Sequence, residues 1–197
     1  MKDVVNGRRE IYLVRHGETD WNSAGRFQGH ANIPLNERGK MQAQEAYEKL
    51  RNIDFDLIYS SDLERAAETA QIINANRDIP IQYDVRLRER NAGELAGLTL
   101  SEMSKIKGIE LTISKYISDD ILEGIEPLSQ LISRVSEFIE QIMNNEFNKC
   151  LIIGHGGSLS IIASTLTGIP FKEMMFKNCG IKKVIMEDSH AFLEEVV

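Results

Sequence analysis

The sequence has few cysteines and no long apolar run. Its 197 residues include only Cys150 and Cys179, which form no C-x-x-C pair and have no histidine cluster around them, so we expect neither a disulfide framework nor a zinc site. No apolar stretch reaches the roughly 18 residues that a membrane span needs, and residues 1–10 are too polar for a secretory signal. These absences predict a cytoplasmic protein with no membrane partner.

Positive charge is also scarce. The chain carries 23 Lys and Arg residues against 30 Asp and Glu residues, which gives a formal net charge of −7. Such a chain is a poor general binder of nucleic acid, so no nucleic-acid partner is expected, and any anionic ligand must be held by a local cluster of basic side chains. The length and the 42% of hydrophobic residues suit one globular domain over residues 1–197.

Strands and helices are predicted to alternate along the chain. Strands are expected at 10–14, 57–59, 79–83, 150–153, 181–186 and 191–197. Helices are expected at about 37–51, from 60–61 onward, at 127–145 and at about 158–167. Asn36 is a good N-cap, and Thr99 with Glu102 matches a capping box. The alternation favours an α/β fold with a mostly parallel central sheet that helices cover on both faces.

Three strand-to-helix junctions carry groups that can bind an anion. They are Arg15 and His16 after the first strand, Ser60, Ser61 and Arg65 after the second, and His155, Gly156 and Gly157 after the strand at 150–153. Ligands of open α/β sheets bind outside the carboxyl ends of the strands, so we expect two histidines and two arginines to converge on one crevice. Each residue alone has an ordinary structural explanation, and the joint pattern carries the inference.

Other phosphate chemistries lack their motifs. There is no G-x-x-x-x-G-K-[ST] loop, and neither cysteine is followed by the arginine of a cysteine phosphatase loop. Asp54 and Asp56 resemble the aspartate pair of metal-dependent phosphatases, but they precede their strand and therefore lie at the wrong end of the sheet. No cluster of Asp, Glu and His suggests a metal, so no metal and no other cofactor is expected.

Six motifs follow one another between residues 11 and 157. They are Arg15-His16-Gly17-Glu18-Thr19, Trp21-Asn22, Arg26-Phe27-Gln28-Gly29-His30, Ser60-Ser61-Asp62-Leu63-Glu64-Arg65-Ala66, Leu87-Arg88-Glu89 and Gly154-His155-Gly156-Gly157. In this order they resemble the histidine phosphatase superfamily, which has the phosphoglycerate mutase-like fold. The resemblance implies a three-layer αβα sandwich and metal-free phosphoryl transfer through a phosphohistidine.

The resemblance also implies roles for single residues. His16 resembles the nucleophile, Arg15, Arg65 and His155 resemble the pocket that holds the phosphoryl group, and Glu89 resembles the general acid and base. The positions expected to bind substrate are Asn22, Gln28, Gly29 and Gly156. His16 must attack through a neutral ring nitrogen, so we expect its other nitrogen to bond to a backbone carbonyl. The sequence departs from the common pattern on the leaving-group side, at Ala92, Leu95 and Ala96.

The superfamily contains phosphatases and mutases. The resemblance implies that mutases carry arginines for the substrate carboxylate between the acid and the second histidine. This chain has no arginine between Arg90 and Arg134 and none after Arg134, so we favour a phosphatase of broad specificity or directed at one metabolite. A 2,3-bisphosphoglycerate-dependent phosphoglycerate mutase and a catalytically weak phosphate-binding module remain alternatives.

The substrate is expected to be a small-molecule phosphomonoester. Segment 98–126, rich in Ile, Leu and Met, is predicted to cap the active site and to favour a larger or less polar alcohol over a small sugar acid. A homodimer is compatible with the sequence.

Overall fold

A computed structural model describes residues 7–118, 123–188 and 190–196. Six strands form one sheet in the order β3-β2-β4-β1-β5-β6. Their bounds are β1 Arg9–Arg15, β2 Leu57–Ser60, β3 Ile81–Tyr83, β4 Lys149–Gly154, β5 Ile181–Glu187 and β6 His190–Glu195. The first four strands in this order are parallel, whereas β5 is antiparallel to β1 and β6 is antiparallel to β5. The predicted mostly parallel sheet is therefore confirmed.

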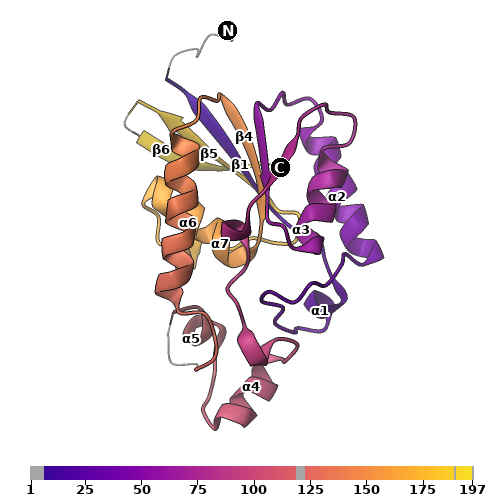
Figure 1. Cartoon of the computed structure of the whole chain (residues 1–197), viewed down its shortest axis with the longest axis vertical. Helices are drawn as coiled ribbons and strands as arrows, with labels where there is room; N and C mark the ends of the chain where they lie inside the picture. The colour runs from indigo at the N-terminus through magenta and orange to yellow at the C-terminus, as the bar shows by residue number, and fades with distance from the viewer. Residues whose placement is uncertain (1–6, 119–122, 189, 197) are drawn as a thin grey trace.

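Helices cover both faces of this sheet (Figure 1). One face carries α2 (Glu37–Leu50) and α3 (Glu64–Ile73), and the other carries α6 (Leu128–Met143) and α7 (Gly156–Thr167). The shorter helices are α1 (Asp20–Ser23), α4 (Leu100–Lys107) and α5 (Ile113–Ser118), with single 3-10 turns at Val85–Leu87, Gly93–Leu95 and Phe171–Glu173. The predicted αβα sandwich is confirmed. In the described ranges no helix is long and apolar enough to cross a membrane.

The apolar run of β1 is buried on both sides. Ile11 and Leu13 lie in the cluster that contains α6 and α7, while Tyr12 and Val14 lie in the cluster that contains α2 and α3. Because side chains alternate across a strand, a strand between two helical layers must be apolar at every position. This is why the sequence of β1 shows a continuous run and no alternation.

Two predicted helix caps are present in the structure, whereas two helices begin at residues other than the predicted ones. The Asn36 side chain accepts the N–H of Gly39 at 2.8 Å, and the capping box of Thr99 and Glu102 is present. Helix α3 begins at Glu64 and not at 60–61, because Leu63 is still extended. Helix α7 begins at Gly156, two residues earlier than predicted, because both glycines of the motif already belong to its first turn.

The register of the sheet brings the three junctions together. Arg15 pairs with Gly154, and Ser60 pairs with Ile153, so β1, β4 and β2 end at the same edge. Helices α4 and α5 lie beyond this edge, separated from the sandwich (Figure 1). They surround a small apolar cluster of their own, which contains Leu95, Met103, Leu111, Tyr116 and Ile125.

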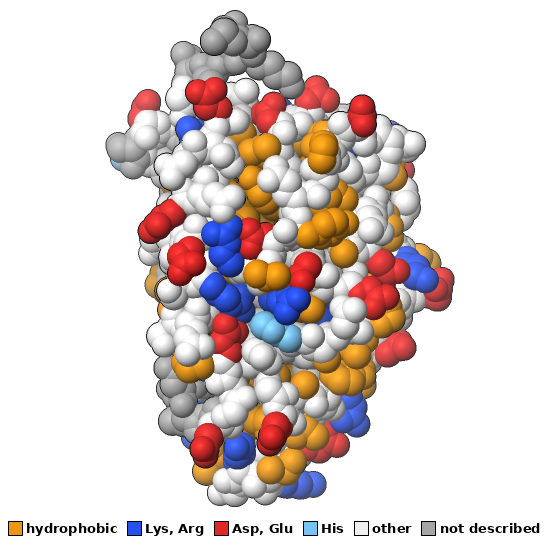
Figure 2. Space-filling view, in the orientation of Figure 1, with side chains coloured by type: hydrophobic (Ala, Val, Ile, Leu, Met, Phe, Trp, Pro, Cys, Tyr) orange, Lys and Arg blue, Asp and Glu red, His pale blue; other side chains and the backbone are white. Residues whose placement is uncertain are grey.

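The net negative charge is not evenly mixed over the surface. Acidic side chains are spread over the face drawn in Figure 2, whereas Lys and Arg side chains gather near its middle, next to a histidine. Several arginines form ion pairs with carboxylates, among them Arg86 with Asp84, Arg88 with Asp62 and Arg134 with Glu126. Local positive charge is thus present on a chain that is acidic overall.

Candidate active site

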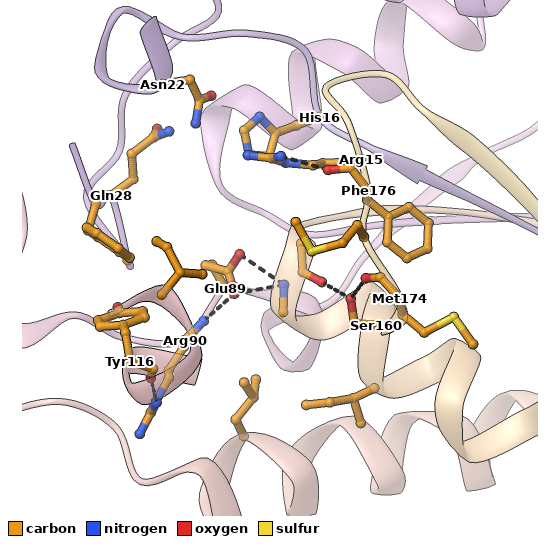
Figure 3. A pocket seen from close by; sticks show the side chains of 18 of the residues that line it. Arg15, His16, Asn22, Gln28, Glu89, Arg90, Tyr116, Ser160, Met174 and Phe176 are labelled. Carbon is orange, nitrogen blue, oxygen red and sulfur yellow. Dashed lines mark hydrogen bonds between the residues drawn. The ribbon is translucent and has the colours of Figure 1, made fainter. Parts of the chain in front are cut away.

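A cavity of about 380 Å³ lies at the carboxyl ends of β1 and β4. Eight of the nine predicted site residues line it, namely Arg15, His16, Asn22, Gln28, Gly29, Arg65, Glu89 and Gly156 (Figure 3). The ninth, His155, lies next to His16, with 5.0 Å between the two ring centroids. The structure therefore brings together groups from four separate parts of the chain.

The imidazole of His16 is buried and held in one orientation. Only 3% of the residue is exposed, and Nδ1 lies 2.7 Å from the carbonyl oxygen of Gly17. A carbonyl can only accept, so Nδ1 carries the hydrogen and Nε2 carries the lone pair. Burial and the positive charges of Arg65 and Arg15 hold the pKa of His16 well below its usual 6.5. The expected carbonyl partner is confirmed, and the ring is uncharged at neutral pH.

A side chain that the sequence analysis missed also holds this segment. Asn178 donates from Nδ2 to the backbone oxygen of His16 at 3.0 Å and to Oδ1 of Asn22 at 3.3 Å. The backbone N–H of Cys179 donates to the oxygen of Arg15 at 3.0 Å. These contacts exist only because β5 pairs with β1, and no local motif around residue 178 signals them.

Arg65, which is buried, and Arg15, which is half-buried, supply positive charge to the cavity. Arg65, 1% exposed, donates to the carbonyl oxygens of Gly29 and Ala31, both at 2.8 Å, and Arg15 donates to the oxygen of Phe176 at 2.8 Å. Burial lowers the pKa of Arg65 to about 10 and also lowers the pKa of Arg15. Because the pKa of arginine is ordinarily very high, both side chains still stay cationic at neutral pH. In the described ranges no three His, Cys, Asp or Glu side chains meet as a metal-ligand group.

Buried polar atoms without a hydrogen-bond partner are concentrated here. Four of the five such side-chain atoms in the described part of the chain are Nε of Arg15, Nε of Arg65, Oε1 of Gln28 and Nδ1 of His155. Leaving a buried donor or acceptor unpaired costs about 1–3 kcal/mol, so such atoms are rare in native interiors. Their gathering around one cavity, three of them on cationic or imidazole groups, fits an anionic ligand.

His155 belongs to the same cluster but is not among the residues that line the cavity. It is fully buried, and its Nε2 lies 2.9 Å from Oγ of Ser61, which also accepts the N–H of Leu63. Burial and the charge of Arg65 hold its pKa well below 6.5. The hydrogen bond between Nε2 and the Ser61 hydroxyl can run in either direction, depending on which ring nitrogen of His155 carries the hydrogen.

The carboxylate of Glu89 is held by two backbone N–H groups, that of Gly157 in the first turn of α7 and that of the adjacent Arg90. Its two oxygens lie 3.2 and 3.1 Å from the N–H of Gly157, and Oε1 accepts the N–H of Arg90 at 2.9 Å (Figure 3). A Cβ at position 157 would come within 2.3 Å of Oε1. The last glycine of this motif thus leaves open the space that the carboxylate occupies, and a side chain there would displace Glu89.

The arginines on either side of Glu89 turn away from it. Arg88 pairs with Asp62, and Arg90 donates to the carbonyl oxygens of Glu126 and Tyr116. The guanidinium groups of Arg88 and Arg90 are thus engaged by other partners, while Arg15 and Arg65 lie in the cavity with the Glu89 carboxylate. That balance leaves a net positive charge where the predicted anion would lie.

The remaining predicted positions divide into two kinds. Asn22, on α1, and Gln28, in the loop that follows α1, point into the cavity (Figure 3). Gly29 has φ +50°, and a Cβ there would lie 2.4 Å from the backbone nitrogen of Ala92. Glycine is required at this close approach, and its carbonyl is the one that holds Arg65.

The far wall of the cavity is apolar. Its large apolar side chains are Phe27, Ile113, Tyr116, Leu128, Leu131, Ile161, Phe171, Met174, Met175 and Phe176. The rings of Phe27 and Tyr116 pack with 4.2 Å between centroids. Segment 171–176 was not predicted to take part, although three consecutive apolar residues outside any predicted strand or helix were a usable signal.

Comparisons with known proteins agree with this geometry. Residues 11–197 match the family described as Histidine phosphatase superfamily (branch 1). Among curated proteins, the chain is 31% identical over 185 residues to the probable phosphoglycerate mutase GpmB of Salmonella choleraesuis, covering 91% of this chain and 86% of the relative. It is 32% identical over 188 residues to the same protein of Erwinia tasmaniensis, with the same coverage.

Solved structures with similar folds include proteins described as phosphatases. The alpha-ribazole phosphatase of Shigella flexneri has a TM-score of 0.85 at 27% identity, covering 95% of each chain. The mycobacterial glucosyl-3-phosphoglycerate phosphatase has a TM-score of 0.81 at 25% identity, covering 95% of this chain and 98% of that one. Bacillus stearothermophilus YhfR has a TM-score of 0.84 at 26% identity, covering 95% of this chain and 96% of that one.

Proposed function

Because the chain belongs to branch 1 of the histidine phosphatase superfamily, we propose that it is a metal-independent phosphomonoester hydrolase that works through a phosphohistidine. One observation carries the proposal. A neutral, buried imidazole with its lone pair on Nε2 lies in one cavity with Arg15, Arg65 and a carboxylate. This set offers a nucleophile, a cradle for anionic oxygens and a proton carrier, which are the parts that phosphoryl transfer needs.

The first half-reaction forms a phosphohistidine. Nε2 of His16 attacks the phosphorus, the bond from phosphorus to the ester oxygen breaks, and Glu89 gives its proton to the departing alcohol oxygen. The hydrogen bond from Nδ1–H of His16 to the carbonyl oxygen of Gly17 stabilises the ring as it gains positive charge. Arg15 and Arg65 hold the transferring oxygens by charge-assisted hydrogen bonds.

The second half-reaction releases phosphate. Glu89, now a carboxylate, takes a proton from water as that water attacks the phosphorus. The bond from phosphorus to Nε2 breaks, and the lone pair returns to His16. The two positive charges of Arg15 and Arg65 match the charge of a phosphomonoester dianion.

Hydrolysis is favoured over mutase activity by the cations of the outer cavity. Besides the cradle, the basic residues of the lining are Arg26, Arg90 and Lys172. Arg26 donates to the carbonyl oxygen of Gly97 and to Glu102, and Arg90 donates to two carbonyl oxygens. No pair of arginines in the described lining is thus turned toward a substrate carboxylate, which a three-carbon sugar acid would need.

The apolar wall favours a bulky, weakly polar alcohol as the leaving group. Segment 98–126 would act as the cap, because its Ile113 and Tyr116 line the cavity, and Tyr116 lies across from Met174 and Phe176 (Figure 3). An alcohol that extends past Glu89 would therefore meet aromatic and aliphatic carbon on both sides.

The proposed function predicts hydrolysis of p-nitrophenyl phosphate in excess chelator. Release of p-nitrophenol should be unaffected by EDTA, because Arg15 and Arg65 supply the positive charge. The assay is run beside one for isomerisation of 3-phosphoglycerate primed with 2,3-bisphosphoglycerate. Fast isomerisation with weak hydrolysis would favour the mutase, and phosphate binding with neither activity would favour a binding module.

The apolar wall predicts that 2-naphthyl phosphate is a better substrate than phenyl phosphate. The two alcohols have similar acidity, so the comparison isolates the second ring. At about 0.8 kcal/mol per buried CH₂-sized group, partial burial of four further carbons should raise kcat/KM about tenfold. Met175→Ser and Ile113→Ser, at positions 70% and 49% exposed, should lower the naphthyl-to-phenyl ratio and leave phenyl phosphate hydrolysis unchanged.

Ile106→Ser is the matched control for these two variants. Ile106 lies on α4, is 63% exposed and does not line the cavity, so its variant should keep the wild-type ratio. A ratio near one in the wild-type protein, with phenyl phosphate hydrolysed normally, would contradict the apolar subsite and leave the hydrolase assignment intact.

A further inference from the structure

A single guanidinium on α6 holds the backbone that carries Glu89. Arg134 donates from Nη1 to the carbonyl oxygens of Arg86 and Arg88, both at 2.7 Å, and from Nη2 to the carbonyl oxygen of Glu89 at 2.8 Å. Three carbonyls within four residues thus point at one side chain. Neither the predicted motifs nor the proposed chemistry gives Arg134 a part.

A carboxylate fixes Arg134 from the other side. Glu126 accepts from Nε at 2.7 Å and from Nη2 at 2.9 Å, and the two side chains are only 18% and 11% exposed. Oε2 of Glu126 also accepts the N–H of Asn91 at 2.8 Å. The pair therefore spans residues 86–91, with Glu89 near the middle of the span.

A second side chain completes the grip on Glu89. Nε2 of His30 lies 2.8 Å from the same carbonyl oxygen that Arg134 binds. With the Glu89 carbonyl held by two groups and its carboxylate held by the N–H of Gly157, both ends of the residue are fixed. General acid catalysis depends on placing the acid within hydrogen-bond reach of the leaving oxygen, and such placement needs a supporting frame.

We propose that Arg134 is a positioning residue for the general acid, acting through the backbone of residues 86–89. The inference rests on the proposed role of Glu89. Arginine suits this task because its planar fork presents five N–H donors, which here serve three carbonyls and a carboxylate at once. Lysine has one donor atom and cannot reproduce this geometry, so Arg134→Lys should retain only part of the positioning effect.

The test is the dependence of kcat/KM on the acidity of the leaving alcohol. Phenol needs a proton as it departs, whereas p-nitrophenol is a much stronger acid and leaves with little help. Acid catalysis contributes about 10²–10⁴-fold, so partial loss of it in Arg134→Gln should lower kcat/KM for phenyl phosphate about 30-fold and for p-nitrophenyl phosphate about threefold or less. Arg134→Lys should fall between wild type and Arg134→Gln, and it carries the test alone if Arg134→Gln does not fold.

Two further variants frame the result. Arg86→Gln is the matched control, since Arg86 pairs with Asp84 in the same loop and its side chain makes none of the bonds to Glu89, so both substrates should keep wild-type rates. Glu89→Gln should show the same selective loss as Arg134→Gln, only larger. Binding of inorganic phosphate, which reports the cradle of Arg15 and Arg65, should be unchanged in the Arg134 variants.

The outcomes distinguish the positioning role of Arg134 from the acid role of Glu89. Equal losses on both substrates in the Arg134 variants, or no loss, would overturn the positioning role while Glu89→Gln still showed selectivity. Equal losses on both substrates in Glu89→Gln would instead remove the proposed acid, and the inference with it.

Discussion

Replacing His16 with alanine is expected to lower kcat/KM for p-nitrophenyl phosphate by at least about 10⁴-fold. Removing the nucleophile of a covalent mechanism leaves only binding and charge stabilisation, and losses of this order or larger are the rule. Affinity for inorganic phosphate should change far less, because Arg15 and Arg65 keep their own carbonyl partners. A steady-state assay and a calorimetric titration with phosphate measure the two effects separately.

His190→Ala is the control for that experiment. His190 is exposed on β6, at the far edge of the sheet from β3, and its variant should retain wild-type activity. Residual activity of His16→Ala within tenfold of wild type would contradict a phosphohistidine at this position. Loss of phosphate binding together with activity would mean that the imidazole also maintains the cradle.

The free energy of unfolding is expected to fall as the pH drops from about 7 to 5. Burial, with the charge of Arg65, holds the pKa values of His16 and His155 well below 6.5 in the folded chain. In the unfolded chain both recover a pKa near 6.5, so below that pH the unfolded state binds more protons and is favoured. The stability is fully present above the unfolded pKa and is lost as the pH falls toward the folded values.

Each histidine contributes at most about 1.4 kcal/mol per pH unit, so the pair contributes up to about 2.7 kcal/mol per unit below pH 6.5. Urea unfolding at pH 5, 6, 7 and 8 measures the slope. His16→Asn should remove about half of it, and this difference between variants isolates the histidine from carboxylates that titrate at lower pH. A slope identical in the two proteins, or stability that rises on acidification, would show that His16 is not buried as a neutral ring.

The order of strands and helices could be predicted because the local signals were strong. The run at 10–14 is apolar on both faces, and Asn36 and Thr99 cap their helices by short-range hydrogen bonds. The convergence of Arg15, His16 and Arg65 followed from one rule about parallel strands, which depends on topology and not on side-chain detail.

The parts that could not be predicted depend on contacts between distant segments. Asn178 reaches His16 only through the pairing of β1 with β5, and Arg134 reaches Glu89 only because α6 packs against that loop. Neither residue lies in a motif, and the sequence around each is ordinary. The starts of α3 and α7 differ from the predicted ones by two to four residues. Leu63 stays extended before α3, and α7 begins with two glycines, which are poor helix formers and therefore gave no signal of a helix start.

Three predictions stay open beside the confirmed family and fold. The cytoplasmic location, the homodimer and the cap role of 98–126 rest on the sequence, and residues 119–122 of that segment lie outside the described residues. The roles of the individual site residues are likewise proposals, which the variants above are designed to test.

The place of β1 in the sheet has a consequence for biosynthesis. β1 is the first strand to be made, yet both of its neighbours, β4 and β5, come from the last third of the chain. During translation its four apolar residues are therefore not yet paired with β4 or β5 while most of the polypeptide is made. Chaperones commonly bind such exposed apolar segments. Because Arg15 and His16 stand at the end of this strand, a chain that lacks β4 and β5 cannot assemble the pocket and is expected to be inactive.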